Sequence, residues 1–207
     1  RDMNGAEANK SIIANNFVQV GGTNTAYGLY SYNGSHQKIY HNSVNLTNTA
    51  VASSAFYNRS GSNKEVLNNI FANVGDGQSY YTNSSSAIIQ SDHNNLYATG
   101  TNLGYFSGVN YVDLPTWITG TNRDSNSISI DPSFLSTTDL HTTNVSLDKA
   151  GIGVVEVVED FDGDFRDPAK PDIGADEFST AQEDASIFSI DAPSPTFSAD
   201  VQPIIVT

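Results

Sequence analysis

Short stretches of alternating apolar and polar residues recur along the first half of the chain. Each begins with apolar residues, passes through asparagine and returns to an apolar alternation. Four such segments are 12–20, 39–46, 66–74 and 88–97. Strand-forming Val, Ile, Tyr and Phe dominate these segments, while Gly, Asn and Ser cluster between them. The pattern predicts short β-strands separated by tight polar turns, and hence an all-β fold.

The four segments return at a nearly constant interval. When Asn16, Asn42, Asn69 and Asn95 are taken as equivalent, the position number rises by 26, then by 27, then by 26. This interval is too short for a βαβ unit, but it suits one coil of a β-solenoid with short strands joined by tight turns. We therefore predict that the four asparagines stack as a ladder of amides. The alternative is that asparagine is simply a frequent turn residue.

Tyrosines follow the same interval. Tyr30 precedes Asn42 by the same distance along the chain as Tyr57 precedes Asn69. A face that includes Tyr30, Tyr57 and Tyr81 would offer aromatic rings to a glycan. Because successive residues of a strand face opposite sides, about half of the tyrosines must point inward, so stacked rings inside the solenoid are the alternative.

Composition narrows the possible functions of the 207-residue chain. Its net charge of −14 provides no basic surface, which argues against nucleic-acid binding. No apolar run is long enough to span a membrane. The absence of Cys removes disulfides, thiol catalysis and Cys-ligated metal sites. Residues 1–150 carry a net charge of −3 and residues 151–207 a net charge of −11, so the character of the chain changes near residue 151.

The second half of the chain departs from the repeat. Residues 113–118 predict a helical turn with Asp113 as its N-cap. Strand-like alternation returns at 126–130 and at 154–158.

Four aspartates in the acidic half suggest a cation. Asp160, Asp162 and Asp164 alternate around Gly163, and Asp167 follows, so a Ca²⁺ site built from these four carboxylates is one interpretation. An EF-hand is excluded because its twelfth position would be Pro171. The alternative is structural: Asp162 or Asp164 pairs with Arg166 to pin the closing loop to the last coil. No other cofactor and no catalytic residue is predicted, since the acidic cluster of Asp172, Asp176 and Glu177 suits a terminal cap better than a glycosidase site.

Several motifs together carry a family resemblance. They are Trp117, Asn126-Ser127-Ile128, Asp131-Pro132-Ser133-Phe134, Asp139-Leu140-His141 and Ser146-Leu147-Asp148-Lys149-Ala150-Gly151, followed by D-x-D-G-x-x-R at 160–166 and D-I-G-A-x-E at 172–177. The order resembles the last coils of secreted right-handed parallel β-helix repeat proteins, which are pectate-lyase-like in fold and common in Bacteroidetes-type bacteria. The resemblance implies that residues 1–178 form such coils with a cap.

The end of the chain differs again. Residues 185–207 resemble the opening strands of an immunoglobulin-like bacterial adhesion domain, so we expect a β-sandwich to begin there after a linker at 179–184. Two strands alone do not close a sandwich, and the segment is therefore expected to belong to a longer chain.

The expected function follows from the resemblance and from the lack of a catalytic motif. We expect a non-catalytic structural or display module of a large secreted protein at the bacterial cell surface, with adhesion or glycan contact as its role and a surface glycan or another extracellular ligand as its partner. The alternative is a part of a polysaccharide lyase or glycoside hydrolase whose active coils lie upstream.

Overall fold

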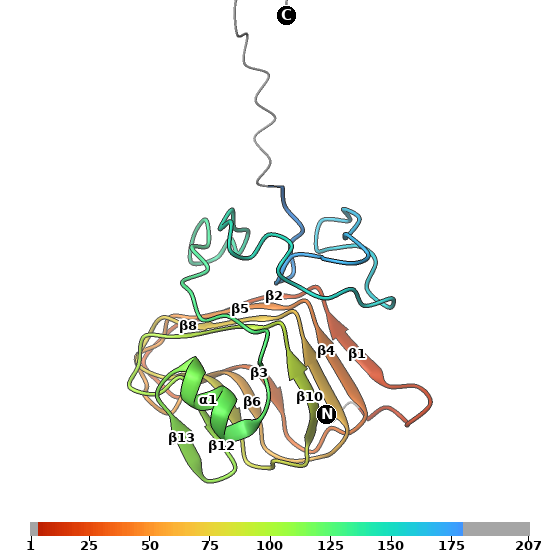
Figure 1. Ribbon diagram of the computed structural model, residues 1–207. Helices are drawn as coiled ribbons and strands as arrows, with labels where there is room; N and C mark the ends of the chain where they lie inside the picture. The colour runs from red at the N-terminus through yellow and green to blue at the C-terminus, as the bar shows by residue number, and fades with distance from the viewer. Residues whose placement is uncertain (1–3, 180–207) are drawn as a thin grey trace, which may run out of the picture.

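The structure, a computed structural model of the chain, describes residues 4–179 and shows a parallel β-solenoid of about four coils (Figure 1). In each coil the chain passes through three strands, and each strand pairs in parallel with its equivalent one coil later. The predicted solenoid is therefore confirmed, because strands that are one repeat apart in the sequence lie side by side.

The strands form three sheets in the described part of the chain. Sheet 1 contains β1 (Ser11–Ala14), β4 (Gln37–Tyr40), β7 (Lys64–Leu67) and β10 (Ile88–Asp92). Sheet 2 contains β2 (Phe17–Val20), β5 (Ser43–Leu46), β8 (Ile70–Asn73) and β11 (Asn95–Ala98). Sheet 3 contains β3 (Tyr27–Ser31), β6 (Ser54–Asn58), β9 (Gln78–Thr82) and β12 (Gly104–Phe106), and β13 (Val109–Tyr111) turns back antiparallel on β12.

A two-residue bend joins sheet 1 to sheet 2 in every coil. Its first residue has a left-handed backbone, with φ between 49° and 59° at Asn15, His41, Asn68 and His93. Asn and His tolerate this conformation better than most side chains. The residue types at these positions therefore favour the bend. Because the bend recurs in each coil, its second residue occupies the equivalent position each time.

Apolar side chains fill the interior of the solenoid. The fully buried positions include Ile39, Val44, Phe56, Phe71 and Tyr80. At the end of the last coil Trp117 is fully buried against Tyr80, Phe106 and Tyr111. Large rings thus pack along the axis and close its C-terminal end.

Trp117 lies on α1 (Leu114–Thr121), the helix predicted at 113–118, which extends beyond the end of that range. Asp113 is its N-cap, as predicted, and accepts a hydrogen bond of 2.9 Å from the amide of Thr116. In Figure 1 the helix lies across the open end of the coils, beside β12 and β13.

Residues 131–178, called the tail here, contain no named helix or strand and lie over the outer face of sheet 2 (Figure 1). Leu147 and Ile173 of the tail pack on Ile70 and Ala72 of β8. The expectation that the motif at 172–177 caps the last coil is wrong. That motif instead covers the flank of several coils, and α1 closes the end. Sheet 2 is consequently buried on both faces, and all four residues of β5 and of β8 are buried.

Two smaller expectations are also wrong. Residues 154–158 do not form a strand, because the amide of Val157 turns back to the carbonyl of Val154. Residues 126–130 pair with the solenoid through a single bridge between Ile128 and Asn95.

The predicted linker and immunoglobulin-like segment lie outside the described residues, apart from Ser179. In the described part, no helix has the length and apolar character needed to cross a membrane.

Candidate functional site

The bends between sheets 1 and 2 hold a column of asparagine side chains. Asn16 Nδ2 donates to Asn42 Oδ1 at 2.8 Å, and Asn42 Nδ2 donates to Asn69 Oδ1 at 2.9 Å. The same amides also donate to bend carbonyls: Asn42 to Ile13 and Tyr40, and Asn69 to Ile39 and Leu67. The column therefore joins successive coils, and it supplies acceptors for bend amides, such as those of Asn42 and Asn69, that do not take part in strand pairing.

The fourth member of the column is Asn94, and the prediction of Asn95 is wrong. Asn69 Nδ2 donates to Asn94 Oδ1 at 3.0 Å, and Asn94 Nδ2 continues to Asp124 Oδ1 at 3.1 Å. Asn95 is the first residue of β11. Its side-chain Nδ2 donates to the carbonyl of Ile130, and its Oδ1 accepts from the amide of Ile130. The interval shortens because the connection between β8 and β9 (74–77) has three residues fewer than that between β5 and β6 (47–53), and a bulge in β10, where Ile88 and Gln90 pair with the adjacent residues Lys64 and Glu65, restores only one of them.

Asp124 ends the column. Besides Asn94, it accepts hydrogen bonds from Trp117 Nε1 at 2.8 Å and from the hydroxyls of Ser91 and Ser127. Burial raises the pKa of Asp124, while these donors oppose the rise. The four donors make this buried carboxyl a structural anchor between the last coil and α1.

On sheet 3 the predicted contact residues lie in one row. Tyr30, Tyr57 and Tyr81 occupy the same register, and Tyr105 extends the row on β12. We call Tyr30, Tyr57, Tyr81 and Tyr105, with Tyr27 beside them, the tyrosine ladder. The ring centroids of Tyr57 and Tyr81 are 4.3 Å apart and those of Tyr81 and Tyr105 are 4.5 Å apart, with nearly parallel planes. These rings lie on the outer face of the sheet, while Phe56 and Tyr80, their neighbours in sequence, point inward.

The stacking decides which part of each ring is available. Tyr57 and Tyr81 use their faces on one another, so they present ring edges and hydroxyl groups to solvent. Tyr30 is 50% exposed; Tyr27 stacks on it with the ring centroids 5.3 Å apart, and Tyr57 is tilted by 56° to it. Tyr32 is 40% exposed, with the Arg59 guanidinium 4.5 Å from its ring centroid. Near the tyrosine ladder, the most exposed rings are therefore Tyr30 and Tyr32, at the N-terminal coils.

The four aspartates proposed to bind Ca²⁺ do not form one site. Asp160 Oδ1 accepts the amides of residues 162, 163 and 164, and its Oδ2 accepts the amide of Glu177. Asp167 Oδ1 accepts the amides of Ala169 and Lys170. Asp160 and Asp167 therefore shape their own loops. Of the four, only Asp162 belongs to the one potential metal-binding group found among residues 4–179.

Arg166 pairs with Glu177 rather than with Asp162 or Asp164. Arg166 Nη1 lies 3.2 Å from Glu177 Oε2, and Nη2 donates to Asn15, Gly174 and Ala175. Its side chain is almost fully buried, so this guanidinium joins the tail to the first bend of the solenoid.

A neighbouring contact on the second bend is made by His41. Its Nδ1 lies 3.2 Å from the carbonyl of Gly174, and its Nε2 accepts from Asn68 Nδ2 at 2.9 Å. Burial, reinforced by nearby Arg166, lowers the pKa of His41 to about 3, so this ring is neutral and donates from Nδ1.

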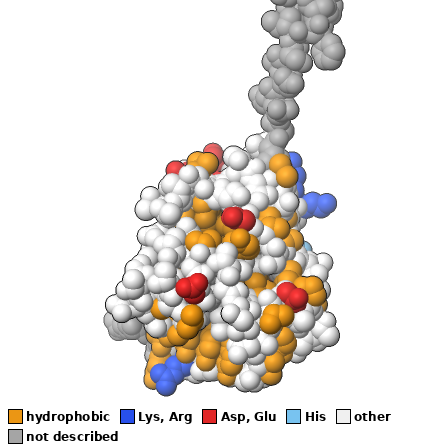
Figure 2. All heavy atoms as spheres, turned by 90° about the vertical axis from the view of Figure 1, so that its left-hand side faces the viewer, with side chains coloured by type: hydrophobic (Ala, Val, Ile, Leu, Met, Phe, Trp, Pro, Cys, Tyr) orange, Lys and Arg blue, Asp and Glu red, His pale blue; other side chains and the backbone are white. Residues whose placement is uncertain are grey.

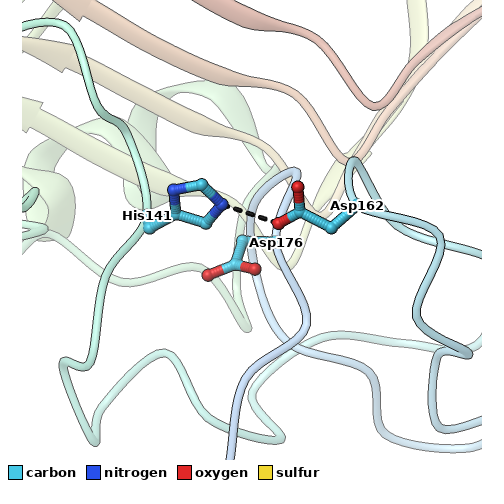
Figure 3. A group of neighbouring side chains, drawn as sticks. All are labelled: His141, Asp162 and Asp176. Atoms are coloured by element: carbon cyan, nitrogen blue, oxygen red, sulfur yellow. Dashed lines mark hydrogen bonds and ion pairs between the residues drawn. The ribbon is translucent and has the colours of Figure 1, made fainter.

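His141, Asp162 and Asp176 converge on one point of the tail (Figure 3). One ligand atom from each residue lies within 4.8 Å of the other two. His141 Nε2 is 2.7 Å from Asp162 Oδ2, and its Nδ1 bonds Asp139. We call these three residues the His–Asp cluster.

The electrostatics of the His–Asp cluster are dominated by carboxylates. Partial burial opposes a charged His141, but hydrogen bonds to Asp139 and Asp162 outweigh it and raise its pKa to about 9. Burial raises the pKa of Asp176; the charge of His141 and the amide of Thr142 oppose the rise, and the carboxylates of Asp160 and Asp162 add to it. The arrangement forms either a network of ion pairs or the ligand set of a cation.

Sequence reasoning missed His141 and Asp176 as partners of Asp162. The three residues belong to separate loops of a tail that has no repeat to align them. His141 and Asp176 were noted only as parts of family-like motifs, so no spacing rule connected them with Asp162.

Comparison of the chain with protein-family models, with curated proteins and with solved structures finds no match.

Proposed function

We propose that this chain is a non-catalytic display module of a secreted bacterial surface protein, and that sheet 3 contacts an uncharged glycan. The observation that carries the proposal is the tyrosine ladder, a row of aromatic side chains on the outside of a strand-paired scaffold. Tyrosines in such rows expose an apolar body together with a hydroxyl, which suits contact with sugars.

The ladder supports contact by two routes. Tyr30, which is half exposed although Tyr27 stacks on it, offers ring surface for a sugar to contact. The edges and hydroxyls of Tyr57, Tyr81 and Tyr105 offer hydrogen bonds at the spacing of the coils. Because the rings hold one another in place, little side-chain entropy is lost on binding.

Charge argues for an uncharged glycan rather than an acidic one. The net charge of −14 repels polyanions at long range. Figure 2 shows one side of the molecule on which hydrophobic side chains lie among uncharged polar groups, with only a few acidic and basic side chains between them. A neutral ligand meets no electrostatic penalty on such a surface.

Binding to a glycan array, followed by calorimetry on any hit, tests the proposal. We expect Tyr30→Ala to weaken binding about tenfold, corresponding to about 1.4 kcal/mol. Phe165→Ala removes an aromatic side chain that is 79% exposed on the tail and is the matched control, with unchanged affinity.

Two results would contradict the proposal. If no neutral glycan binds, or if Tyr30→Ala and Phe165→Ala bind equally well, the ladder serves only to stabilise the solenoid. If the protein cleaves acidic polysaccharides to unsaturated uronates, the module is catalytic and the polysaccharide lyase alternative replaces it.

A further inference from the structure

We propose that the His–Asp cluster binds one divalent transition-metal ion, with Zn²⁺ as the representative species, and that the ion ties three loops of the tail together. The ligands would be His141 Nε2 and one carboxylate oxygen each from Asp162 and Asp176. The proposal is independent of the glycan surface, since the tail lies on sheet 2 and the tyrosine ladder lies on sheet 3.

The geometry fits a single small ion. In Figure 3 His141 and Asp162 face one another and Asp176 lies beside them, and the three residues come from separate stretches of the tail. Their ligand atoms lie within 4.8 Å of one another, and metal–ligand distances of about 2.0–2.2 Å would require them to move by only a fraction of that spacing. Asp162 and His141 already lie at hydrogen-bond distance, where an ion would take the place of the shared proton.

Asp176 is a second, separate indication of a ligand. It is 8% exposed, and one of its carboxylate oxygens lies within 4.8 Å of the ligand atoms of His141 and Asp162. The charge of His141 and the amide of Thr142 are the groups that favour its ionised form. A carboxylate this deeply buried is costly without a cation or several donors. One His141 imidazolium faces the carboxylates of Asp139, Asp162 and Asp176, and a divalent ion would supply additional positive charge.

The orientation of His141 agrees with this role. Its Nδ1 bonds Asp139, which directs Nε2 toward Asp162. Histidines that bind metals commonly donate from the other ring nitrogen to a carboxylate. Phe17 and Phe161 pack around the imidazole, with ring centroids 4.9 and 6.2 Å from it. These rings shield one side of the cluster from water.

The donor set selects the class of metal. One imidazole nitrogen and two carboxylate oxygens suit Zn²⁺, Mn²⁺ or Co²⁺, whereas Ca²⁺ prefers oxygen ligands alone and a larger number of them. The Ca²⁺ expected at Asp160, Asp162, Asp164 and Asp167 is thus replaced by a different ion at a different set of residues, with Asp162 in common.

Titration of the full chain with Zn²⁺, after removal of metal by a chelator, tests the proposal by calorimetry and native mass spectrometry. We expect one Zn²⁺ per chain, a rise in melting temperature with Zn²⁺, and no comparable rise with Ca²⁺. Asp162→Asn should weaken Zn²⁺ binding at least tenfold, because a metal-bound carboxylate is lost while the exposed loop keeps its shape. Asp164→Asn changes the same charge on the same exposed loop and should bind like the parent.

Visible absorption of the Co²⁺ form supplies a readout of coordination that does not depend on stability. Bands typical of a nitrogen- and oxygen-ligated ion should appear with the parent and with Asp164→Asn, and be lost with Asp162→Asn. If the parent binds no stoichiometric Zn²⁺, or if the two variants bind it equally, the proposal is overturned and the His–Asp cluster is a network of ion pairs.

Discussion

An asparagine at each bend between sheets 1 and 2 takes the place of several main-chain partners. Asn69, in the middle of the column, accepts from the amide of Asn42 and donates to the carbonyls of Ile39 and Leu67. Residues Ile39, Asn42, Leu67 and Asn69 are all buried. A leucine has a similar size but no polar group, and a serine hydroxyl is too short to reach the same partners.

Asn69→Ala should therefore be strongly destabilising. The substitution leaves the buried amide of Asn42 without its acceptor, which costs about 1–3 kcal/mol. It also removes one donor from each of the carbonyls of Ile39 and Leu67, of which Leu67 keeps the amide of His41. We expect the free energy of unfolding to fall by roughly 3–5 kcal/mol in urea titrations followed by circular dichroism. Asn16→Ala removes the exposed end of the same column and should cost less than about 1 kcal/mol. Equal losses in the two variants would show that burial of the column is not what matters.

At the scale of elements, the strand period was readable from the sequence because each coil repeats the same inward apolar positions. It failed in the fourth coil, where the inward position of β10 equivalent to Val66 is Ser91, which bonds Asp124. Because the connection between β8 and β9 is also shorter than its counterpart one coil earlier, an interval of 26 selected Asn95 in place of Asn94. A bulge that serves a polar anchor leaves no periodic signal.

The tail was the least predictable element. Its position on sheet 2 depends on single contacts, such as the amide of Gly174 on the carbonyl of Asn68, rather than on an alternating pattern. The family-like motifs indicated that residues 160–178 close the fold, but not which surface they cover. The tyrosine row was predictable in part, because it follows the coil interval. The stacking that covers the ring faces depends on side-chain orientation, which the interval does not determine.

Gly174→Ala tests how closely the tail must approach β8. Gly174 has a φ of 116°, and a Cβ there would lie 2.7 Å from Ile70 Cδ1 and 3.0 Å from Ser43 Oγ. Gly163 has a φ of 92° and open space around a Cβ, so Gly163→Ala carries the backbone strain without the clash. We expect Gly163→Ala to cost about 1–2 kcal/mol and Gly174→Ala about 1–3 kcal/mol more, measured by urea unfolding. Similar losses would mean that the tail can shift away from sheet 2.

At the scale of the whole molecule, the acidic tail is held on a nearly neutral solenoid by a few cationic side chains. Arg166 is buried between them, and Lys38 of β4 pairs with Glu156 of the tail. Apolar packing of Leu147 and Ile173 on β8 supplies the remainder of the interface. Because acidic groups outnumber these partners, the attachment of the tail should respond to pH, and one buried carboxyl makes the direction predictable.

That carboxyl is Asp172, which is almost fully buried. Burial raises its pKa to about 7; nearby Glu177 and Asp148 add to the rise, and the amides of Lys149 and Phe178 oppose it. In the unfolded chain the pKa is near its ordinary value of about 3.9. The folded state therefore holds a proton that the unfolded state has released between about pH 4 and pH 7. The resulting stabilisation is complete below pH 4 and is lost as pH rises through 7.

Urea unfolding at pH 5 and pH 8 of the parent, Asp172→Asn and Asp164→Asn separates this effect from general charge repulsion. Each variant removes one acidic group, so the change in net charge is the same, but only Asp172 is buried. The parent and Asp164→Asn should lose stability together between the two pH values, and Asp172→Asn should lose roughly 2 kcal/mol less, because it has no proton to give up. Parallel losses in all three proteins would place the pH dependence in the overall charge of the tail. A smaller loss in Asp172→Asn alone would show that the tail remains on sheet 2 at neutral pH against the cost of ionising one buried carboxyl.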